Sequence, residues 1–247
     1  MHVWRVYQKL FAWFGPQGWW PIVMTHDSWN MTHRGLRIEH GLTYGIPYSR
    51  LKRYCTPFRD PYFEIAVGAI LTQNTAWRNV AMVIQSLYRA KALTPARLLK
   101  LHPRTLQSLL RPTGYYRQKA KKLRGFSRWL IDKYQGKLER LKNIPLPASR
   151  SELLRVWGIG KETADSILLY ALNKPIFVVD AYTRRFCSSH GVEFDEYDGY
   201  RVYFKNELRR LPTQTGVNKR SGKLTKIYQE YHALLVAWGK QSKSLNS

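Results

Sequence analysis

Acidic residues, cysteines and long apolar runs are all scarce in this 247-residue sequence. Only 16 Asp and Glu oppose 41 Lys and Arg, which gives a formal net charge of +25. The two cysteines, Cys55 and Cys187, could form at most one disulfide, so a disulfide-rich scaffold is excluded. No window approaches the roughly 20 apolar residues of a membrane span. The N-terminus lacks an apolar signal core with a cleavage site, so we expect a cytoplasmic protein.

The basic excess predicts an acidic partner. Apolar residues make up 44% of the chain, enough for the core of one large or two small domains. A globular protein of this charge is drawn to polyanions, with nucleic acid first and an anionic membrane surface second. Nucleic acid is favoured because the basic residues are spread through helical segments and turns and form no single amphipathic stripe. Examples are Arg117, Lys119, Lys121, Lys122 and Arg124.

The hydrophobic pattern predicts an all-α fold. From residue 62 onward apolar residues recur at helical spacing, and no segment shows the alternation of a strand. Residues 22–60, rich in Gly, Pro, Tyr, Arg and His, are the least helical: a long loop, a small insertion or a mobile segment. Residues 213–223 are expected to form a loop. Helices are expected at 63–88 (one or two), 94–100, from 103 to before 112, 118–134, from a Ser149 cap to 157–158, 161–173, 192–211 and 227–240.

A glycine-containing turn between two of these helices carries the first functional signal. It lies in the sequence LLRVWGIGKETADS, residues 153–166. Gly158 and Gly160 allow a tight turn, and the first N–H groups of the next helix can then bind a phosphate. Lys161 adds charge, and Thr163 adds a hydroxyl. The pattern indicates a helix-hairpin-helix at 150–172 that clamps the DNA backbone without reading its sequence. The alternative is a glycine C-cap between two packed helices.

An aspartate provides the second signal. Asp180 follows Phe177-Val178-Val179, 20 residues after Gly160. A carboxylate at the end of a buried run is either the N-cap of the next helix or a catalytic group. Both interpretations stay open at this point.

Together these residues resemble the helix-hairpin-helix DNA glycosylases of the endonuclease III superfamily. The resemblance covers residues 62–190 and includes Phe63-Glu64, GAILTQNT at 68–75 and GYYRQKA at 114–120, with weaker similarity around Gly239-Lys240. It implies two helical domains with the base pocket in the cleft between them. Residues 1–21 and 175–247 would form one domain, 62–174 the other, and 22–61 an irregular basic insertion.

Two departures from the superfamily pattern bear on the reaction. Bifunctional members carry a nucleophilic lysine where this chain has Glu162, and a carboxylate cannot form an imine. A slip to Lys161 would turn the amine by about 100° around the helix. Residues 188–247 contain no cysteine, which excludes the iron-sulfur cluster of many members. The histidines, including His26, His33 and His40, have no metal-site spacing, so neither a metal nor another cofactor is expected.

A narrower resemblance is to the monofunctional 3-methyladenine DNA glycosylases. It rests on Gly18-Trp19-Trp20-Pro21 and on Thr72-Gln73-Asn74-Thr75-Ala76-Trp77. It implies that Trp19 and Trp77 sandwich an alkylated purine, whose positive charge favours aromatic faces. The alternative is that these tryptophans belong to the core. The implied pocket residues are Trp19, Trp20, Pro21, Trp77, Tyr182 and Glu162.

The resemblance also assigns roles in DNA binding and catalysis. Gln73 would fill the hole left by the flipped base, and Tyr115 would wedge into the opposite strand. Ionised Asp180 would stabilise positive charge on the sugar and guide water. The backbone-binding residues would be Gly158, Gly160, Lys161, Thr163 and Lys119. The expected partner is double-stranded DNA with a damaged base, bound by a monomer that is associated with the nucleoid and not with a membrane.

Other functions remain open from the sequence. They are a non-catalytic DNA-binding protein, a bifunctional lyase, which Glu162 disfavours, and a glycosylase for mismatched or deaminated bases. The segment 22–61 either contacts DNA or covers apolar surface. Its candidate DNA contacts are Arg34, Arg37, Arg50, Lys52 and Arg53.

Overall fold

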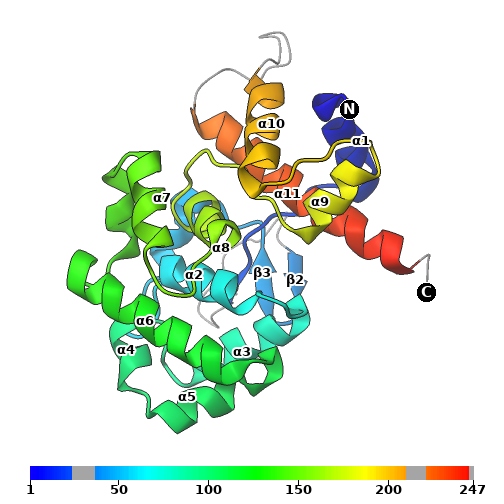
Figure 1. The fold of residues 1–247 in the computed structure, drawn as a ribbon. Helices are drawn as coiled ribbons and strands as arrows, with labels where there is room; N and C mark the ends of the chain where they lie inside the picture. Colours follow the sequence, from blue (N-terminus) through cyan, green and yellow to red (C-terminus); the bar gives the residue numbers. More distant parts are fainter. Residues whose placement is uncertain (24–36, 210–220, 245–247) are drawn as a thin grey trace. The chain divides into compact units, whose positions relative to one another are not determined.

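The computed structural model describes residues 1–23, 37–209 and 221–244, and helices dominate it, so the all-α fold class is confirmed (Figure 1). The chain divides into two compact units, one of Met1–Trp19 with Asn173–Ser247 and one of Trp20–Leu172. The segment after residue 21 therefore belongs to the second unit instead of standing apart. Within the described residues, no helix is both long and apolar enough to cross a bilayer.

The first unit is built from α1 (Val3–Phe14), α9 (Ala181–Ser188), α10 (Tyr197–Arg209) and α11 (Ser221–Ser244). Its core is aromatic: the rings of Phe177 and Phe204 stack with centroids 4.1 Å apart, and Tyr231 packs edge-on against both. The Tyr231 hydroxyl donates to the Val3 carbonyl at 2.8 Å. The N-terminal helix is thereby anchored to the C-terminal one.

Two helices of this unit differ from the prediction. The helix expected from residue 192 begins at Tyr197, because the chain first reverses at Gly191 (φ 66°) and the Val192 amide donates to the Cys187 carbonyl. α11 starts at Ser221, six residues before its expected start. Most of the loop expected at 213–223 lies outside the described residues.

The second unit is organised around α2 (Pro61–Leu71), in which all 11 residues are buried. The Asp60 carboxylate caps this helix by accepting from the amides of Tyr62 and Phe63. The long α6 (Tyr116–Tyr134) crosses the unit with α4 (Pro95–Lys100) and α5 (Pro103–Leu110) alongside (Figure 1). The remaining helical elements are α3 (Trp77–Arg89), α7 (Leu146–Leu154), α8 (Lys161–Ser166), the π-helical turn η5 (Ile167–Ala171), and the 3₁₀ turns η2 (Tyr48–Tyr54), η3 (Arg111–Thr113) and η4 (Leu138–Asn143).

A small antiparallel sheet corrects the prediction that residues 22–61 are irregular. Its strands are β1 (Ile22–Val23), β2 (Arg37–Glu39) and β3 (Leu42–Tyr44), in the order β1-β3-β2. His40 and Gly41 form the turn between β2 and β3 with φ values of 51° and 70°. Strands of two or three residues are too short to show a period of two, so the sequence pattern missed them.

A buried ion pair joins β1 to α2. The Arg59 Nε donates to Glu64 Oε2 at 2.7 Å, and both side chains are fully buried. Glu64 Oε1 accepts from the Val23 amide at 2.6 Å, and an Arg59 guanidinium NH₂ group donates to the Val23 carbonyl at 2.7 Å. The pair therefore satisfies both backbone groups of one strand residue.

The predicted cap of α7 is wrong. The helix begins at Leu146 after Pro145, and Ser149 lies inside it, where its hydroxyl donates to the Leu146 carbonyl at 3.1 Å. Prolines are tolerated in the first helical turn, so the Leu146-Pro147 pair starts the helix without a side-chain cap. The helix that follows the hairpin also changes: α8 ends at Ser166 and continues as the π turn η5.

Candidate active site

Asp180 is the N-cap of α9. Its Oδ1 accepts from the Thr183 amide at 2.7 Å and from the Thr183 hydroxyl at 2.9 Å. Its second oxygen, Oδ2, lies 3.5 Å from His232 Nε2. The capping interpretation is therefore confirmed, but it uses one carboxylate oxygen and leaves the other directed at His232.

His232 was not predicted from the sequence. It lies on α11, is 4% exposed, and meets the half-buried Trp19 ring edge-on with centroids 5.9 Å apart. A single histidine on an apolar helix face carries no motif, so only the fold could show that it faces Asp180. Trp19, Asp180 and His232 thus form one cluster within the first unit.

The electrostatic surroundings keep Asp180 ionised. Burial raises the pKa of its carboxyl, but hydrogen bonding and charge from His232 together with the two Thr183 hydrogen bonds outweigh burial, and the net pKa lies below its usual 3.8. A lowered pKa means that the carboxylate persists at neutral pH. Its stabilising contribution to the fold is lost only as the pH falls through the lowered pKa.

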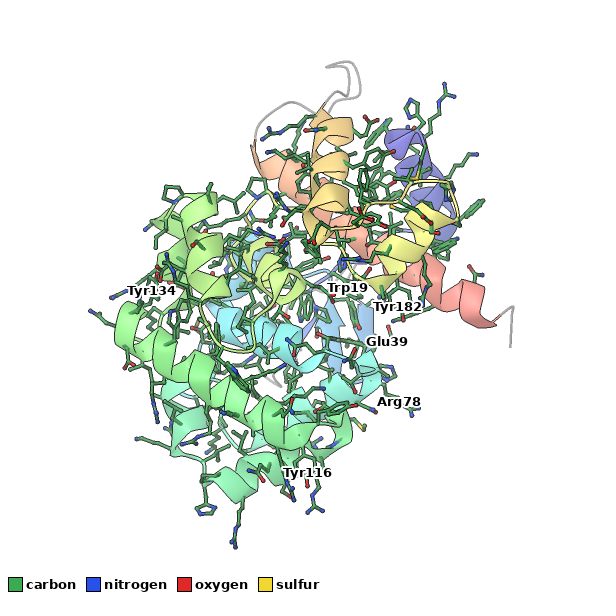
Figure 2. The ribbon with its side chains drawn as sticks, in the orientation of Figure 1. Trp19, Glu39, Arg78, Tyr116, Tyr134 and Tyr182 are labelled. Carbon is green, nitrogen blue, oxygen red and sulfur yellow. The ribbon has the colours of Figure 1, made fainter. Side chains whose placement is uncertain are left out.

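Tyr182 depends on a glycine of α11. A Cβ atom on Gly239 would overlap the Tyr182 ring, so any side chain there would displace the tyrosine. The Arg185 guanidinium lies 4.8 Å from the same ring. Tyr182 and Trp19 are both labelled in Figure 2. The predicted pocket role of Tyr182 stays a prediction.

Trp20 and Pro21 are buried, and their predicted place in the base pocket stays a prediction. Trp20 packs edge-on against Trp77, with ring centroids 5.3 Å apart, and its ring is tilted against that of Tyr170 at 5.2 Å. A Cβ on Gly68 would come within 3.0 Å of the Trp20 ring. Trp20 therefore fills the core behind Trp77, as the core alternative for the tryptophans predicts.

Trp77 is half-buried and is held by a residue from the segment that the sequence left unassigned. Its Nε1 donates to the Tyr44 hydroxyl at 2.8 Å, and Tyr44 belongs to β3. Burial, followed by the Glu39 charge, raises the pKa of Tyr44 to about 12, so the phenol stays neutral. Trp19 and Trp77 belong to different units, and their sandwich around a base stays a prediction.

The glycine turn lies between α7 and α8, and a buried carboxylate holds its two helices together. Arg150 donates to Asp165 through Nε at 2.7 Å and through a guanidinium NH₂ group at 3.1 Å. Gly158 has φ 85°, and a Cβ there would lie 2.5 Å from Lys122 Cγ. Gly160 is the N-cap of α8, where an added Cβ would meet nothing. Gly158 is thus required by conformation and by space, whereas Gly160 has no such steric requirement.

Gln73 is tied to this hairpin. Its Nε2 donates to the Gly158 carbonyl at 3.2 Å and to the Thr163 hydroxyl at 2.9 Å, and its Oε1 accepts from the Lys122 ammonium. Thr163 is 5% exposed and already receives this hydrogen bond. The predicted phosphate contact of Thr163 is therefore wrong, because its hydroxyl is buried and hydrogen-bonded to Gln73. The insertion of Gln73 into DNA stays a prediction.

Lys119 is also structural. It is 3% exposed, and its ammonium donates to the carbonyls of Leu71 at 2.9 Å and Thr113 at 2.7 Å. Burial, followed by the Lys122 charge, lowers its pKa to about 8. The predicted phosphate contact of Lys119 is wrong, because its buried ammonium donates to the carbonyls at the ends of α2 and η3.

The remaining predicted site residues that the structure describes are exposed or half-exposed. Tyr115 is 71% exposed in a left-handed conformation just before α6, and Glu162 is exposed on α8 beside half-exposed Lys161. Arg34, His26 and His33 lie outside the described residues. The remaining basic residues predicted for the 22–61 segment are exposed: Arg37, Arg50, Lys52 and Arg53.

Comparison with known proteins decides the family. The model of the HhH-GPD superfamily of base excision DNA repair proteins matches residues 67–199. The chain belongs to this superfamily. A Methanocaldococcus jannaschii protein with a proposed role as a DNA repair glycosylase is 34% identical to this HhH-GPD chain. The alignment covers 95% of this chain and 85% of the relative.

Solved structures agree with the family. The H. pylori 3-methyladenine DNA glycosylase bound to 1,N6-ethenoadenine matches this HhH-GPD chain with a TM-score of 0.65 and 31% identity, covering 73% of this chain and 85% of that one. A non-covalent endonuclease III–DNA complex matches with a TM-score of 0.56 and 22% identity over 72% of this chain and 73% of the other. The second similarity establishes the shared fold.

Proposed function

We propose that this HhH-GPD protein is a monofunctional DNA glycosylase that releases alkylated purines from double-stranded DNA. The observation that carries the proposal is the half-buried Asp180 carboxyl with its lowered pKa. One of its oxygens accepts from Thr183, and the other faces His232 next to Trp19. A negative charge with a fixed orientation suits a reaction that develops positive charge.

The proposed reaction is hydrolysis of the N-glycosidic bond. The nucleotide first leaves the duplex stack, at a cost of a few kcal/mol. An alkylated purine carries positive charge and departs neutral, so its loss needs no proton from the enzyme. Asp180 then stabilises the positive charge that grows on the sugar and orients the attacking water. Water adds its oxygen to the sugar carbon as the carbon–nitrogen bond breaks, and its proton passes to the carboxylate and solvent.

Aromatic rings support an alkylated purine as the substrate. Trp77 is fixed by its hydrogen bond to Tyr44, and Trp19 by its edge contact with His232. Aromatic faces attract a cationic base by about 0.5–2 kcal/mol for each well-placed ring. The similar H. pylori enzyme is a 3-methyladenine glycosylase by name, which favours the same class of substrate.

The direct test is release of free base from duplex DNA treated with a methylating agent, with strand cleavage followed before and after alkali. We expect release of 3-methyladenine and nicking only after alkali. Release from mismatched or deaminated DNA alone would overturn the substrate class. Binding to DNA without release of any base would overturn the glycosylase proposal.

Glu162 supports the absence of lyase activity. Because it occupies the position of the superfamily's nucleophilic lysine, we expect borohydride to trap no covalent adduct between the native protein and damaged DNA. Glu162→Lys restores the amine and is expected to give a measurable adduct. Lys161→Arg is the control, and this variant, like the native protein, should form no adduct. An adduct that depends on Lys161 would show that the neighbouring lysine is the nucleophile.

His232 is expected to act as a positioning residue for Asp180. His232→Phe keeps an aromatic ring against Trp19 but removes the Nε2 that faces Oδ2. Because that nitrogen lowers the pKa of Asp180, its loss raises the pKa, and base release should fall off at a higher pH than in the native protein. A shift of one pKa unit corresponds to about 1.4 kcal/mol, or tenfold in the ionisation equilibrium.

The readout is the single-turnover rate of base release as a function of pH, with DNA affinity measured beside it. His232→Gln is the matched variant, since its amide can still donate to Oδ2 and should recover part of the native pH profile. If the Phe and Gln variants lose rate equally with no change in pH profile, His232 serves packing alone.

A further inference from the structure

One face of α6 carries four cations. Arg117, Lys121, Arg124 and Arg128 follow one another at spacings of four, three and four residues, which places them on a single helical stripe. They line a groove of about 390 Å³, the α6 groove. Its other lining residues are Pro103 and Gln107 of α5 and Ala120 and Gly125 of α6. The expectation that the basic residues form no single stripe is therefore wrong for this helix.

In the part of the chain that the structure describes, no carboxylate forms an ion pair with these cations. The described residues that line the α6 groove include no acidic residue. Their partners are neutral: Arg124 donates to the carbonyls of Leu99 and Leu101, each at 3.2 Å, and Arg117 lies 5.8 Å from the Tyr116 ring. Like charges on one stripe repel one another, and an anion in the groove relieves that repulsion.

One cation of the α6 groove also contacts a residue next to the hairpin. The Lys121 ammonium lies 4.6 Å above the ring of Trp157, and Trp157 is 56% exposed directly before Gly158. The stripe extends from the α6 end marked by Tyr116 toward the end marked by Tyr134 (Figure 2). From Arg117 to Arg128 it runs for about 16 Å along the helix axis. One strand of a duplex passes about five phosphates over that distance.

We propose that the α6 groove binds consecutive phosphates of duplex DNA that runs on past the hairpin. This inference rests on DNA being the substrate, as proposed above, and adds a second contact region to the hairpin. The ligand is a phosphate run because the groove offers four cations and no base-reading pair of amide side chains. Three of them, Arg117, Lys121 and Arg128, are exposed and supply the contacts, while Arg124 is fixed by its two carbonyls.

Gly125 allows the groove to be altered by a single charge. It is exposed in the lining, and an added Cβ would meet no atom within 4 Å. Gly125→Gln and Gly125→Glu introduce side chains of equal size, and both favour the helix over glycine. We expect Gly125→Glu to weaken binding to a long undamaged duplex by on the order of tenfold relative to Gly125→Gln, since a carboxylate then faces the phosphates.

Salt dependence provides the second measurement. Combined Arg117→Gln, Lys121→Gln and Arg128→Gln should flatten the slope of log affinity against log salt by about 0.9 for each phosphate that the protein no longer neutralises. The control makes the same charge change on exposed residues of the first unit: Arg5→Gln, Lys9→Gln and Arg209→Gln. Thermal unfolding verifies that each triple variant is folded.

The outcomes separate the groove from the glycosylase proposal, because binding to undamaged duplex requires no base release. The α6 groove is supported if only the groove variants bind duplex more weakly, and if the loss is greater on a long duplex than on one trimmed to the hairpin contact. That result supports the groove even if the protein releases no base. Equal weakening in the control triple, or equal affinities of the two Gly125 variants, overturns it. So does a groove-specific loss of binding to anionic lipid vesicles with duplex affinity unchanged.

Discussion

Asp180→Asn should abolish base release and leave DNA binding nearly unchanged. The substitution removes the negative charge that stabilises the growing charge on the sugar, and losses of general-base and electrostatic stabilisation reach on the order of 10²–10⁴-fold. Asparagine remains a good N-cap, so its side-chain oxygen can still accept from the Thr183 amide and hydroxyl. The fold of α9 is therefore preserved, and the loss reports on chemistry.

The measurement is single-turnover base release from methylated duplex together with the dissociation constant for the same DNA. Asp195→Asn, at an exposed carboxylate beyond the end of α9, is the control for the change of net charge and should release base at the native rate. Native activity in Asp180→Asn would remove Asp180 from the mechanism. Lost binding together with lost activity would indicate that the substitution damages the fold.

Glu64→Gln should lower the free energy of unfolding more than any other substitution considered for this protein. It leaves the Arg59 guanidinium fully buried without its counter-charge, and breaking one side of a buried ion pair costs about 3–5 kcal/mol. The hydrogen bond from the Val23 amide to Glu64 Oε1 is weakened as well, so β1 should detach from α2. The free energy of unfolding in urea measures the effect.

Two controls make this prediction specific. Lys133→Met breaks an exposed ion pair with Glu152 and should cost no more than about 1 kcal/mol. Arg59→Met combined with Glu64→Leu removes both charges and should be less destabilising than Glu64→Gln alone, since apolar replacement of a buried pair leaves no orphaned charge. A loss below about 1 kcal/mol for Glu64→Gln would show that water reaches the pair.

Long periodic segments were predicted with the greatest accuracy. The basic helix expected at 118–134 is α6, and the short helices after Thr94 and from Pro103 begin where their caps and prolines indicate. The wrong predictions of secondary structure fall in segments whose local sequence pattern is short. The strands β1, β2 and β3 have two or three residues each, and the Leu146-Pro147 start of α7 needs no capping serine.

Side-chain roles were predicted less well than helices, because residue type does not reveal burial. Lys119 and Thr163 have the chemistry of phosphate contacts, yet the fold turns both inward, where one closes helix ends and the other accepts from Gln73. Trp20 likewise resembles Trp19 in sequence but lies in the core beside Gly68. Adjacent residues can point to opposite sides of the backbone, and tertiary packing selects the buried one.

The sequence by itself determined the helical fold class, the basic character, the glycine turn and the position of Asp180, because these depend on local pattern and composition. It also determined the absence of a lysine at position 162 and of cysteines after position 187. Only the tertiary structure decided that His232 faces Asp180, that Tyr44 holds Trp77 and that four cations of α6 line one groove. Those contacts join residues that are distant in the chain or on separate helices, and they form only when hydrophobic burial brings the helices together.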